Sequence, residues 1–259
     1  MNVSIRIIGI ATMFFWIFLI AFAVSAVYSI KDLQFDFGEA RFSVSPNHGI
    51  LFSLPIYIDN NGYYSIDSFN ITTEFSDSEG AFITEGFTLI PVIPKGENAT
   101  IVHNVTLNLD GSLEGGQQYL FNDSELRIAT SVGMRFAEVF PVEASTNFSL
   151  PWGAPFYNFM LGEPEYSGFN LTHQIVTVPL SFENHASFDL TGEIQLKIYN
   201  EAGVLLGENQ AAFEVLRFSS YNGQFELYVQ SARITSSGRF EVYLLTPFLD
   251  CEPLVIPYG

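Results

Sequence analysis

The chain has 259 residues and a formal net charge of −18, with 26 Phe, 12 Tyr and one Cys. The acidic balance excludes nucleic-acid binding and argues against docking on an anionic lipid surface, because both need clustered cations. The aromatic content excludes general disorder, and the lone Cys251 excludes an intrachain disulfide.

The first element in the chain is an apolar segment of 24 uncharged residues between Arg6 and Lys31. A helix rises about 1.5 Å per residue, so this segment can cross a hydrocarbon core of about 30 Å. Residues 1–31 are therefore predicted to form an N-terminal transmembrane anchor. The alternative is a signal peptide cleaved after Ala23 or Ala26, but the apolar stretch exceeds the usual signal length of about 7–15 residues.

Sequons for N-linked glycosylation are concentrated after this apolar segment, and only Asn2 precedes it. Chance would give roughly two, so the excess favours an extracellular body, although strand-rich sequences also contain many Asn and Thr. The predicted glycosylation sites are Asn70, Asn98, Asn104, Asn122, Asn147 and Asn170.

Two segments about 124 residues apart repeat one pattern, LPIYIDNNG at residues 54–62 and VPLSFENHA at residues 178–186. A period of this length exceeds any solenoid repeat, so it indicates duplication of a whole domain. We expect a first domain at residues 32–150 and a second at residues 156–259. The Pro- and Gly-containing segment 151–155 between them is expected to be a short hinge.

Alternating apolar and polar residues, broken by Asn, Asp and Gly turns, predict short antiparallel strands in both domains. In the first domain the expected strands are 33–37, 50–58, 64–76, 82–90, 100–109, 126–136 and 146–150. In the second domain they are 172–182, 188–199, 204–206, 211–218, 224–232 and 239–245. The fold class is therefore all-β, with two tandem immunoglobulin- or fibronectin-like antiparallel β-sandwiches preceded by one transmembrane α-helix.

Three local features qualify this strand pattern. Pro55 and Pro179 interrupt otherwise regular strands at one shared position, and a strand accepts proline at an edge or a bulge. Residues 119–123 are compatible with a short helical turn. Trp152, inside the expected hinge, would make the two domains rigid if it packs against both, and would leave them independent if it is solvated.

The repeated segments 60–66 and 184–190 place an Asn-centred turn before an aromatic and then an aliphatic residue. Here the chain resembles the late-embryogenesis-abundant type 2 domain, also called the water-stress and hypersensitive-response domain. The resemblance extends by pattern over residues 34–259 and includes tandem forms behind one membrane helix in archaeal surface proteins. That family usually has Asn-Pro at the turn, whereas this chain has Asn60-Asn61 and Asn184-His185. The resemblance implies a seven-stranded β-sandwich with a binding or protective role and no catalytic centre.

Motifs for catalysis, cofactors and metals are absent from the sequence, which has no Gly-x-Ser-x-Gly elbow, zinc helix or phosphate-binding loop. The oxygen-rich loop 108–114 has Gly at the fourth place instead of the sixth, so it does not match an EF-hand. Among 28 Asp and Glu no pair is singled out for glycoside chemistry. The histidines occur singly, at His48, His103, His173 and His185. We expect no catalytic residue, no cofactor and no metal site.

These observations predict a single-pass membrane protein whose extracellular body has a structural or binding role at the cell surface and is not an enzyme. Its expected partners are the membrane, through the helix, and other surface proteins. The alternative is an accessory single-pass subunit of a larger membrane complex, and an extracellular hydrolase is least favoured. Positions where the copies differ, Asn61 against His185 and Gly62 against Ala186, are the expected places for specialised function.

Overall fold

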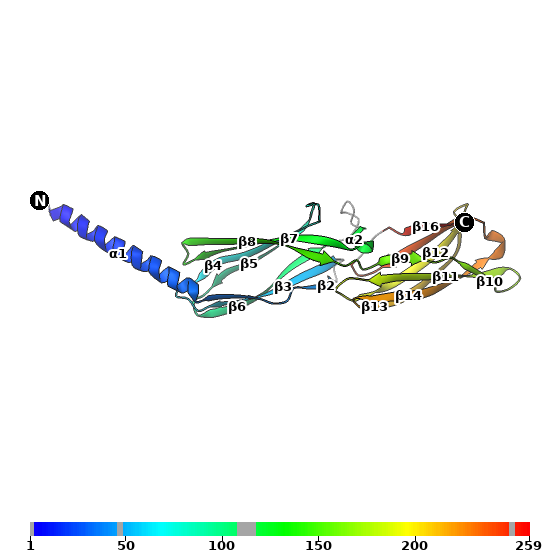
Figure 1. Ribbon diagram of the computed structural model, residues 1–259, viewed down its shortest axis with the longest axis horizontal. Helices are drawn as coiled ribbons and strands as arrows, with labels where there is room; N and C mark the ends of the chain where they lie inside the picture. The colour runs from blue at the N-terminus through cyan, green and yellow to red at the C-terminus, as the bar shows by residue number, and fades with distance from the viewer. Residues whose placement is uncertain (1–2, 46–48, 108–117, 249–251) are drawn as a thin grey trace.

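The computed structural model describes residues 3–45, 49–107, 118–248 and 252–259, with side chains from residue 12 onward. One helix, α1 (Val3–Lys31), projects from one end of an elongated molecule, and two β-structured bodies follow it end to end (Figure 1). The expected all-β fold with one N-terminal helix is confirmed. Thr12–Lys31 is long and apolar enough to span a membrane, a property that a signal sequence shares.

The first body consists of two antiparallel four-stranded sheets. One sheet has β3 (Gly49–Asn60) at its centre, with β6 (Glu97–Leu107) on one side and β1 (Leu33–Phe37) and β2 (Arg41–Ser45) on the other. The second sheet has the order β5 (Phe82–Ile93), β4 (Ile66–Ser76), β7 (Ser124–Phe136) and β8 (Phe140–Trp152). A short helix, α2 (Gln118–Phe121), precedes β7 and matches the helical turn expected at residues 119–123.

The second body repeats this arrangement strand for strand. One sheet has β11 (His173–Asn184) at its centre, with β14 (Ser219–Gln230) on one side and β9 (Tyr157–Leu161) and β10 (Glu165–Gly168) on the other. The second sheet has the order β13 (Leu205–Val215), β12 (Leu190–Asn200), β15 (Gly238–Leu245) and β16 (Leu254–Tyr258), and η1 (Ser231–Arg233) follows β14. The shared strand order shows that the sequence repeat is a duplicated fold.

Several strand boundaries differ from the sequence-based expectation. The short strands β2, β9, β10 and β16 were not expected, because four or five residues give too little alternation to recognise. The segments 204–206 and 211–218, expected as two strands, form the single strand β13 and the turn after it. Strand β8 is also longer than the expected strand 146–150, because it begins at Phe140 and continues to Trp152, which includes two residues of the expected hinge.

Pro55 and Pro179 lie in central strands and not in edge strands, which corrects the simplest interpretation of the sequence. In an antiparallel strand the N–H and C=O groups of one residue point to the same side. Gly38 donates its N–H to the Pro55 carbonyl (2.9 Å), and Gly162 does so to Pro179 (2.8 Å). Each proline therefore directs its missing donor toward the edge strand, which is broken there into β1 and β2 or into β9 and β10.

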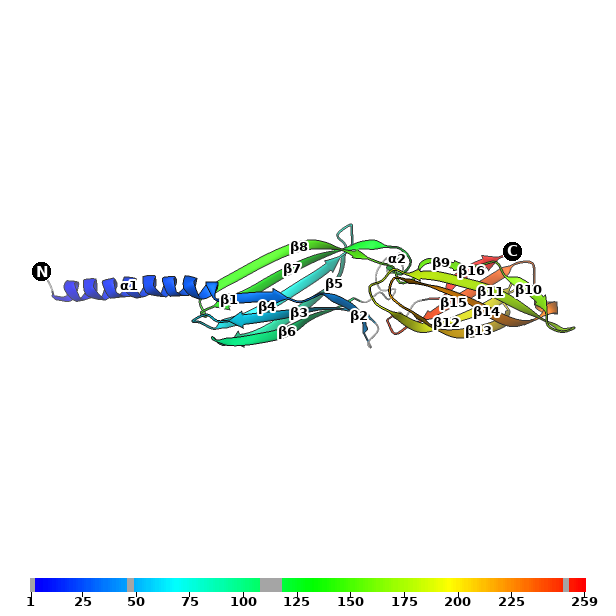
Figure 2. The ribbon, with the colours of Figure 1, turned by 60° about the horizontal axis from the view of Figure 1, so that its bottom comes forward.

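The core consists of the inward-facing residues of each sheet pair, and many of them are aromatic. Along β11 and β12 the alternating apolar residues are fully buried, as the sequence pattern predicts. One hydrophobic cluster, which includes Ala26 of α1, fills the helix-proximal half of the first sandwich. A second cluster runs from the other half of that sandwich through Trp152 and Phe156 into the second sandwich. Figure 2 shows the two sandwiches lying end to end, with α2 close to the boundary between them. The two sandwiches therefore share one continuous core.

Candidate functional site

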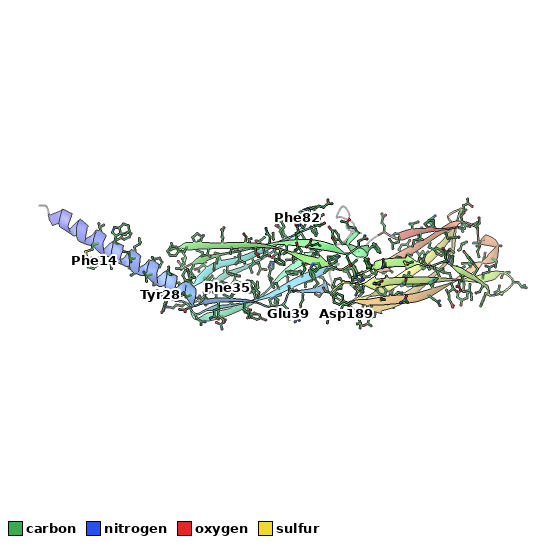
Figure 3. The ribbon with its side chains drawn as sticks, in the orientation of Figure 1. Phe14, Tyr28, Phe35, Glu39, Phe82 and Asp189 are labelled. Carbon is green, nitrogen blue, oxygen red and sulfur yellow. The ribbon has the colours of Figure 1, made fainter. Side chains whose placement is uncertain are left out.

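Two contact regions determine how the parts of this molecule are joined. We call the contact between α1 and the first sandwich the helix junction, and the contact between the two sandwiches the domain junction. Both form at the same place in the repeat, the loop that follows the central strand β3 or β11. Figure 3 shows Tyr28 beside the first sandwich, whereas Phe14 lies farther along α1, away from both sandwiches.

At the helix junction, the last three turns of α1 are part of the folded body. Ala26 and Ser29 are buried. The Ser25 Oγ and Tyr64 hydroxyl oxygens are 2.5 Å apart, and the Tyr63 backbone N–H donates to Ser29 Oγ at 2.6 Å. These contacts fix the position of the helix end relative to the sandwich.

Aromatic packing extends this contact one turn toward the N-terminus. The Phe22 ring stacks on Phe140 with 5.7 Å between ring centroids, and it meets the Tyr64 ring edge-on at 5.5 Å. Beyond Phe22 the large apolar side chains of α1 are exposed, from Met13 to Ile20. The helix thus has a docked C-terminal part and an uncovered apolar part.

Gly62 is required by the helix junction. A Cβ at this position would lie 2.3 Å from Ser29 Oγ and 2.9 Å from the Ser29 carbonyl oxygen, closer than real Cβ contacts occur. The equivalent residue of the second domain, Ala186, has a side chain because no helix approaches there. The difference between the copies at this position therefore follows from what each loop contacts.

The shared Asn of each loop is a structural residue. Asn60 and Asn184 are both fully buried. The Asn60 side-chain amide donates to the carbonyls of Tyr64, Ile93 and Pro94 at 2.9–3.1 Å. The Asn184 amide makes the equivalent bonds in the second domain, to Phe188, Val215 and Leu216. Each side-chain oxygen accepts a backbone N–H two residues later. Neither Asn is free to bind a ligand.

At the domain junction, Trp152 packs against both sandwiches. Its side chain is 4% exposed and its indole N–H donates to the Tyr119 carbonyl at 2.8 Å. The ring meets Phe42 of the first sandwich at 6.0 Å and Phe188 of the second at 6.4 Å. The segment expected as a hinge is therefore packed between the two sandwiches.

The connecting residues after Trp152 are also closely packed. The Ala154 N–H donates to Asp123 Oδ1 at 2.8 Å, and the Phe156 N–H donates to the Leu120 carbonyl at 2.8 Å. A Cβ at Gly153 would lie 1.9 Å from the His185 carbonyl oxygen, so only glycine fits there. The connection thus has little space in which to bend.

His185 bonds to two carboxylates, of which Asp123 joins it to the first sandwich and Glu183 belongs to its own sandwich. Its Nδ1 lies 2.8 Å from Asp123 Oδ2 of the first sandwich, and its Nε2 lies 3.0 Å from Glu183 Oε2. The Tyr157 ring stacks on the imidazole at 4.2 Å. The hydrogen bond with Asp123 raises the pKa of His185, and the hydrogen bond with His185 lowers the pKa of Glu183. Both ring nitrogens are occupied, so His185 has no free nitrogen to act as a general base on a substrate.

A cleft of about 1070 Å³ opens beside this ion pair at the domain junction. Its walls carry cationic and aromatic side chains from both sandwiches, including Arg41, Phe42, Trp152, Phe188 and Arg217. Figure 3 shows Glu39 and Asp189 near this boundary between the sandwiches. No group of three or more His, Cys, Asp and Glu that could hold a metal ion occurs among the described residues. The described residues of the cleft thus offer aromatic surfaces and charged groups.

The predicted site residues lie on the surface of the body and do not gather in one place. Asn98, Asn104, Asn122, Asn147 and Asn170 are exposed, whereas Asn70 is half-buried and donates to the Ser68 carbonyl. His103 is buried in the first sandwich, with its Nδ1 2.8 Å from Thr88 Oγ1, and burial lowers its pKa. The loop 108–114, His48 and Cys251 lie outside the described residues.

Comparison with known proteins gives no family for this chain. No family model matches the sequence, and no curated protein matches it. Among solved structures, red sea bream transglutaminase is 13% identical over 88% of this chain and 31% of its own, with a TM-score of 0.31. A family 2 glycosyl hydrolase from Bacteroides cellulosilyticus is 10% identical over 82% of this chain and 28% of its own, with a TM-score of 0.36. The chain thus spans about a third of either protein, and scores this low carry no functional argument.

Proposed function

We propose that this protein is a single-pass membrane protein whose acidic extracellular body serves as a structural or binding module at the cell surface. The observation that supports this proposal most is the helix junction. Cleavage after Ala23 would remove Phe22, and cleavage after Ala26 would remove Ser25 as well, so either cut would expose part of the Tyr64 surface that α1 covers. Retention of α1 as an anchor leaves that packing intact.

The arrangement of contacts favours display over catalysis. The second sandwich lies at the end of the molecule opposite the apolar helix (Figure 1). The helix junction joins α1 to the first sandwich and the domain junction joins the two sandwiches, each through its own hydrophobic cluster. Such a connection holds the second sandwich at a defined distance from the membrane. Among the described residues of the two junctions we find no free catalytic group, and the function we propose is non-enzymatic.

Strand β8 is the surface that we propose for binding a protein partner. It pairs over its whole length with β7, lies at the end of its sheet order, and most of its residues are exposed. Its outward backbone groups can accept an added strand, with Pro141 and Pro151 limiting that pairing to the residues between them. The predicted glycan at Asn147 would lie within the same stretch and restrict access to it.

The experiment that tests this proposal combines mass and topology. Intact-mass measurement of the protein purified from membranes should show residues 1–26 retained, together with glycan mass on the exposed sequons. A Leu171→Cys variant in a Cys251→Ser background should react with a membrane-impermeant maleimide on intact cells, since Leu171 is 104% exposed. A chain that begins after residue 26, or a thiol that reacts only after lysis, would contradict the proposal.

The alternative function, an accessory subunit of a membrane complex, is favoured by one observation. The uncovered part of α1 carries Phe14, Phe15, Trp16 and Phe18, all more than half exposed. A helical segment with this many exposed aromatic side chains can pack against other membrane helices. Purification in mild detergent distinguishes the two functions, because co-purification of other membrane subunits in fixed ratio would support the accessory role.

A further inference from the structure

The end of the first sandwich that faces α1 carries a ring of exposed apolar side chains. We call this end the collar and define it as the turns 61–65, 94–96 and 137–139 with the residues beside them. The turns are neighbours in space, because Gly96 donates its N–H to the Asn60 carbonyl and Ala137 does so to Ser65. The exposed apolar members of the collar are Tyr28, Tyr63, Val92, Val139 and Phe140.

The docked helix determines where this collar lies relative to a bilayer. A hydrocarbon core of about 30 Å takes up about 20 helical residues, so a core that begins after Arg6 ends near Ala26. Phe22, which stacks on Phe140, would then lie about 6 Å inside the outer hydrocarbon boundary. Moving the helix outward until Phe22 reached that boundary would draw Arg6 about 4–5 Å into the hydrocarbon, which is unfavourable.

We propose that the collar is inserted into the outer interface of the bilayer, with its apolar side chains at the outer edge of the hydrocarbon and its charged side chains among the headgroups, so that the sandwich rests on the membrane in a fixed orientation. This inference depends on the membrane anchoring proposed above. Tyr side chains favour the membrane interface, where the ring is apolar and the hydroxyl stays hydrated. The aromatic residues Tyr28 and Tyr63 and the apolar Val139 match that environment.

The charges of the collar match the headgroup layer and limit the depth of insertion. Lys31 and Lys95, two of the three lysines in the chain, lie at this end and can contact lipid phosphates. Glu138 is exposed at the tip of the β7–β8 turn, and Asp32 and Glu97 are exposed nearby. Because carboxylates are costly in hydrocarbon, Asp32, Glu97 and Glu138 should stay among the headgroups, so insertion should stop once the apolar side chains beside Phe22 enter the outer edge of the hydrocarbon.

The test measures lipid contact at three positions of the full chain. Single thiols are introduced in the Cys251→Ser background by Val139→Cys in the collar, Phe14→Cys in the uncovered helix and Leu171→Cys at the far end of the second sandwich. Each is labelled with a small fluorophore, and the protein is reconstituted into phosphatidylcholine nanodiscs. Lipids that carry a spin label on the headgroup, or deep in the acyl chain, then quench whichever probe they contact.

We expect the headgroup spin label to quench the probe at position 139 at least about threefold more than the probe at position 171, because only the collar reaches the interface. The deep spin label should quench position 14. If position 14 is quenched and position 139 behaves like position 171, collar insertion is overturned while the anchor stands. If position 14 is not quenched, the anchor fails, and collar insertion fails with it.

A second variant separates the helix junction from general folding. Gly62→Ala places a methyl group against Ser29 and should release the helix end from the sandwich. We expect quenching at position 139 to fall by about half or more, because the collar is no longer held at the interface. Quenching at position 14 and the circular dichroism of the β-sandwiches should not change. Undiminished quenching at position 139 would overturn the role of helix docking in placing the collar.

Discussion

Single buried side chains hold both loops of the repeat in place. Asn60 and Asn184 each connect three backbone carbonyls and one backbone N–H, which no apolar side chain of similar size can do. Buried backbone groups that lose such a partner remain unsatisfied. The repeated Asn therefore stabilises the loop that receives the preceding element of the chain.

Asn184→Ala should lower the free energy of unfolding by about 2–4 kcal/mol, because it leaves several buried backbone groups without partners. Thermal melting of the full chain in detergent, followed by circular dichroism, measures the loss. Asn222→Ala is the matched control, since Asn222 is exposed. Equal melting temperatures for the two variants would contradict the structural role of Asn184.

The ion pair at His185 should make the domain junction sensitive to pH. The pKa of His185 is raised in the folded state, mainly by Asp123, so its contribution is complete below the unfolded pKa of about 6.5. That contribution is lost as pH rises through the raised folded value. The pKa of Glu183 is lowered, mainly by His185, so its contribution is lost only in acid, as pH falls below about 4.3.

We therefore expect the melting temperature to be highest in mildly acidic solution and to fall as pH increases through neutrality. His185→Gln should remove most of this dependence on the alkaline side. His173→Gln serves as the control, because the His173 ring bonds to its neighbour Thr172 and lies away from the junction. A pH profile that is the same for both variants would show that His185 does not link the sandwiches.

One loop serves as the receiving element in both domains. The N–H of Asn61 donates to the Asp32 carbonyl just after α1, and the N–H of His185 donates to the Ala154 carbonyl just after β8. In each case the residue after the buried Asn binds the chain that enters the domain. The differences between the copies at this loop reflect two different incoming elements, a helix and a sandwich.

Gly62→Ala should also destabilise the helix junction by about 1–3 kcal/mol, the usual cost of forcing a methyl group into a filled space. Trypsin cleavage after Lys31, measured by mass spectrometry, should become faster because the helix end is released. Gly168→Ala is the control, since a Cβ at Gly168 meets nothing within 4 Å. Cleavage at the wild-type rate in the Gly62 variant would contradict the docking of α1.

The whole molecule is an elongated unit because its two sandwiches share a core across the domain junction (Figure 1). Trp152, Phe156 and the carbonyl contacts of the connection leave few degrees of freedom between them. If the helix is a membrane anchor, as we propose, a rigid body of this kind would transmit an orientation set at its helix end to its far end. The proposed collar insertion and the domain junction would then be two parts of one positioning arrangement.

Trp152→Ala should allow the two sandwiches to move independently. It should also lower the free energy of unfolding by about 3–5 kcal/mol, as other truncations of buried aromatic side chains do. Distances between spin labels placed on the two sandwiches should change from a narrow to a broad distribution. Phe218→Ala is the control, because Phe218 lines the same cleft but is 70% exposed. A narrow distribution in the Trp152 variant would show that the ion pair alone holds the sandwiches.

The sequence by itself determined the apolar helix, the duplication and most of the strands, because these depend on local periodicity and composition. Strand pattern alone could not show that Pro55 and Pro179 lie in central strands, since the broken edge strand beside them is a long-range pairing. Only the tertiary structure decided that Trp152 is buried at a junction and that the end of α1 belongs to the first sandwich. Contacts between residues far apart in the chain, such as Ser25 with Tyr64 and Asp123 with His185, leave no periodic signal in a single sequence.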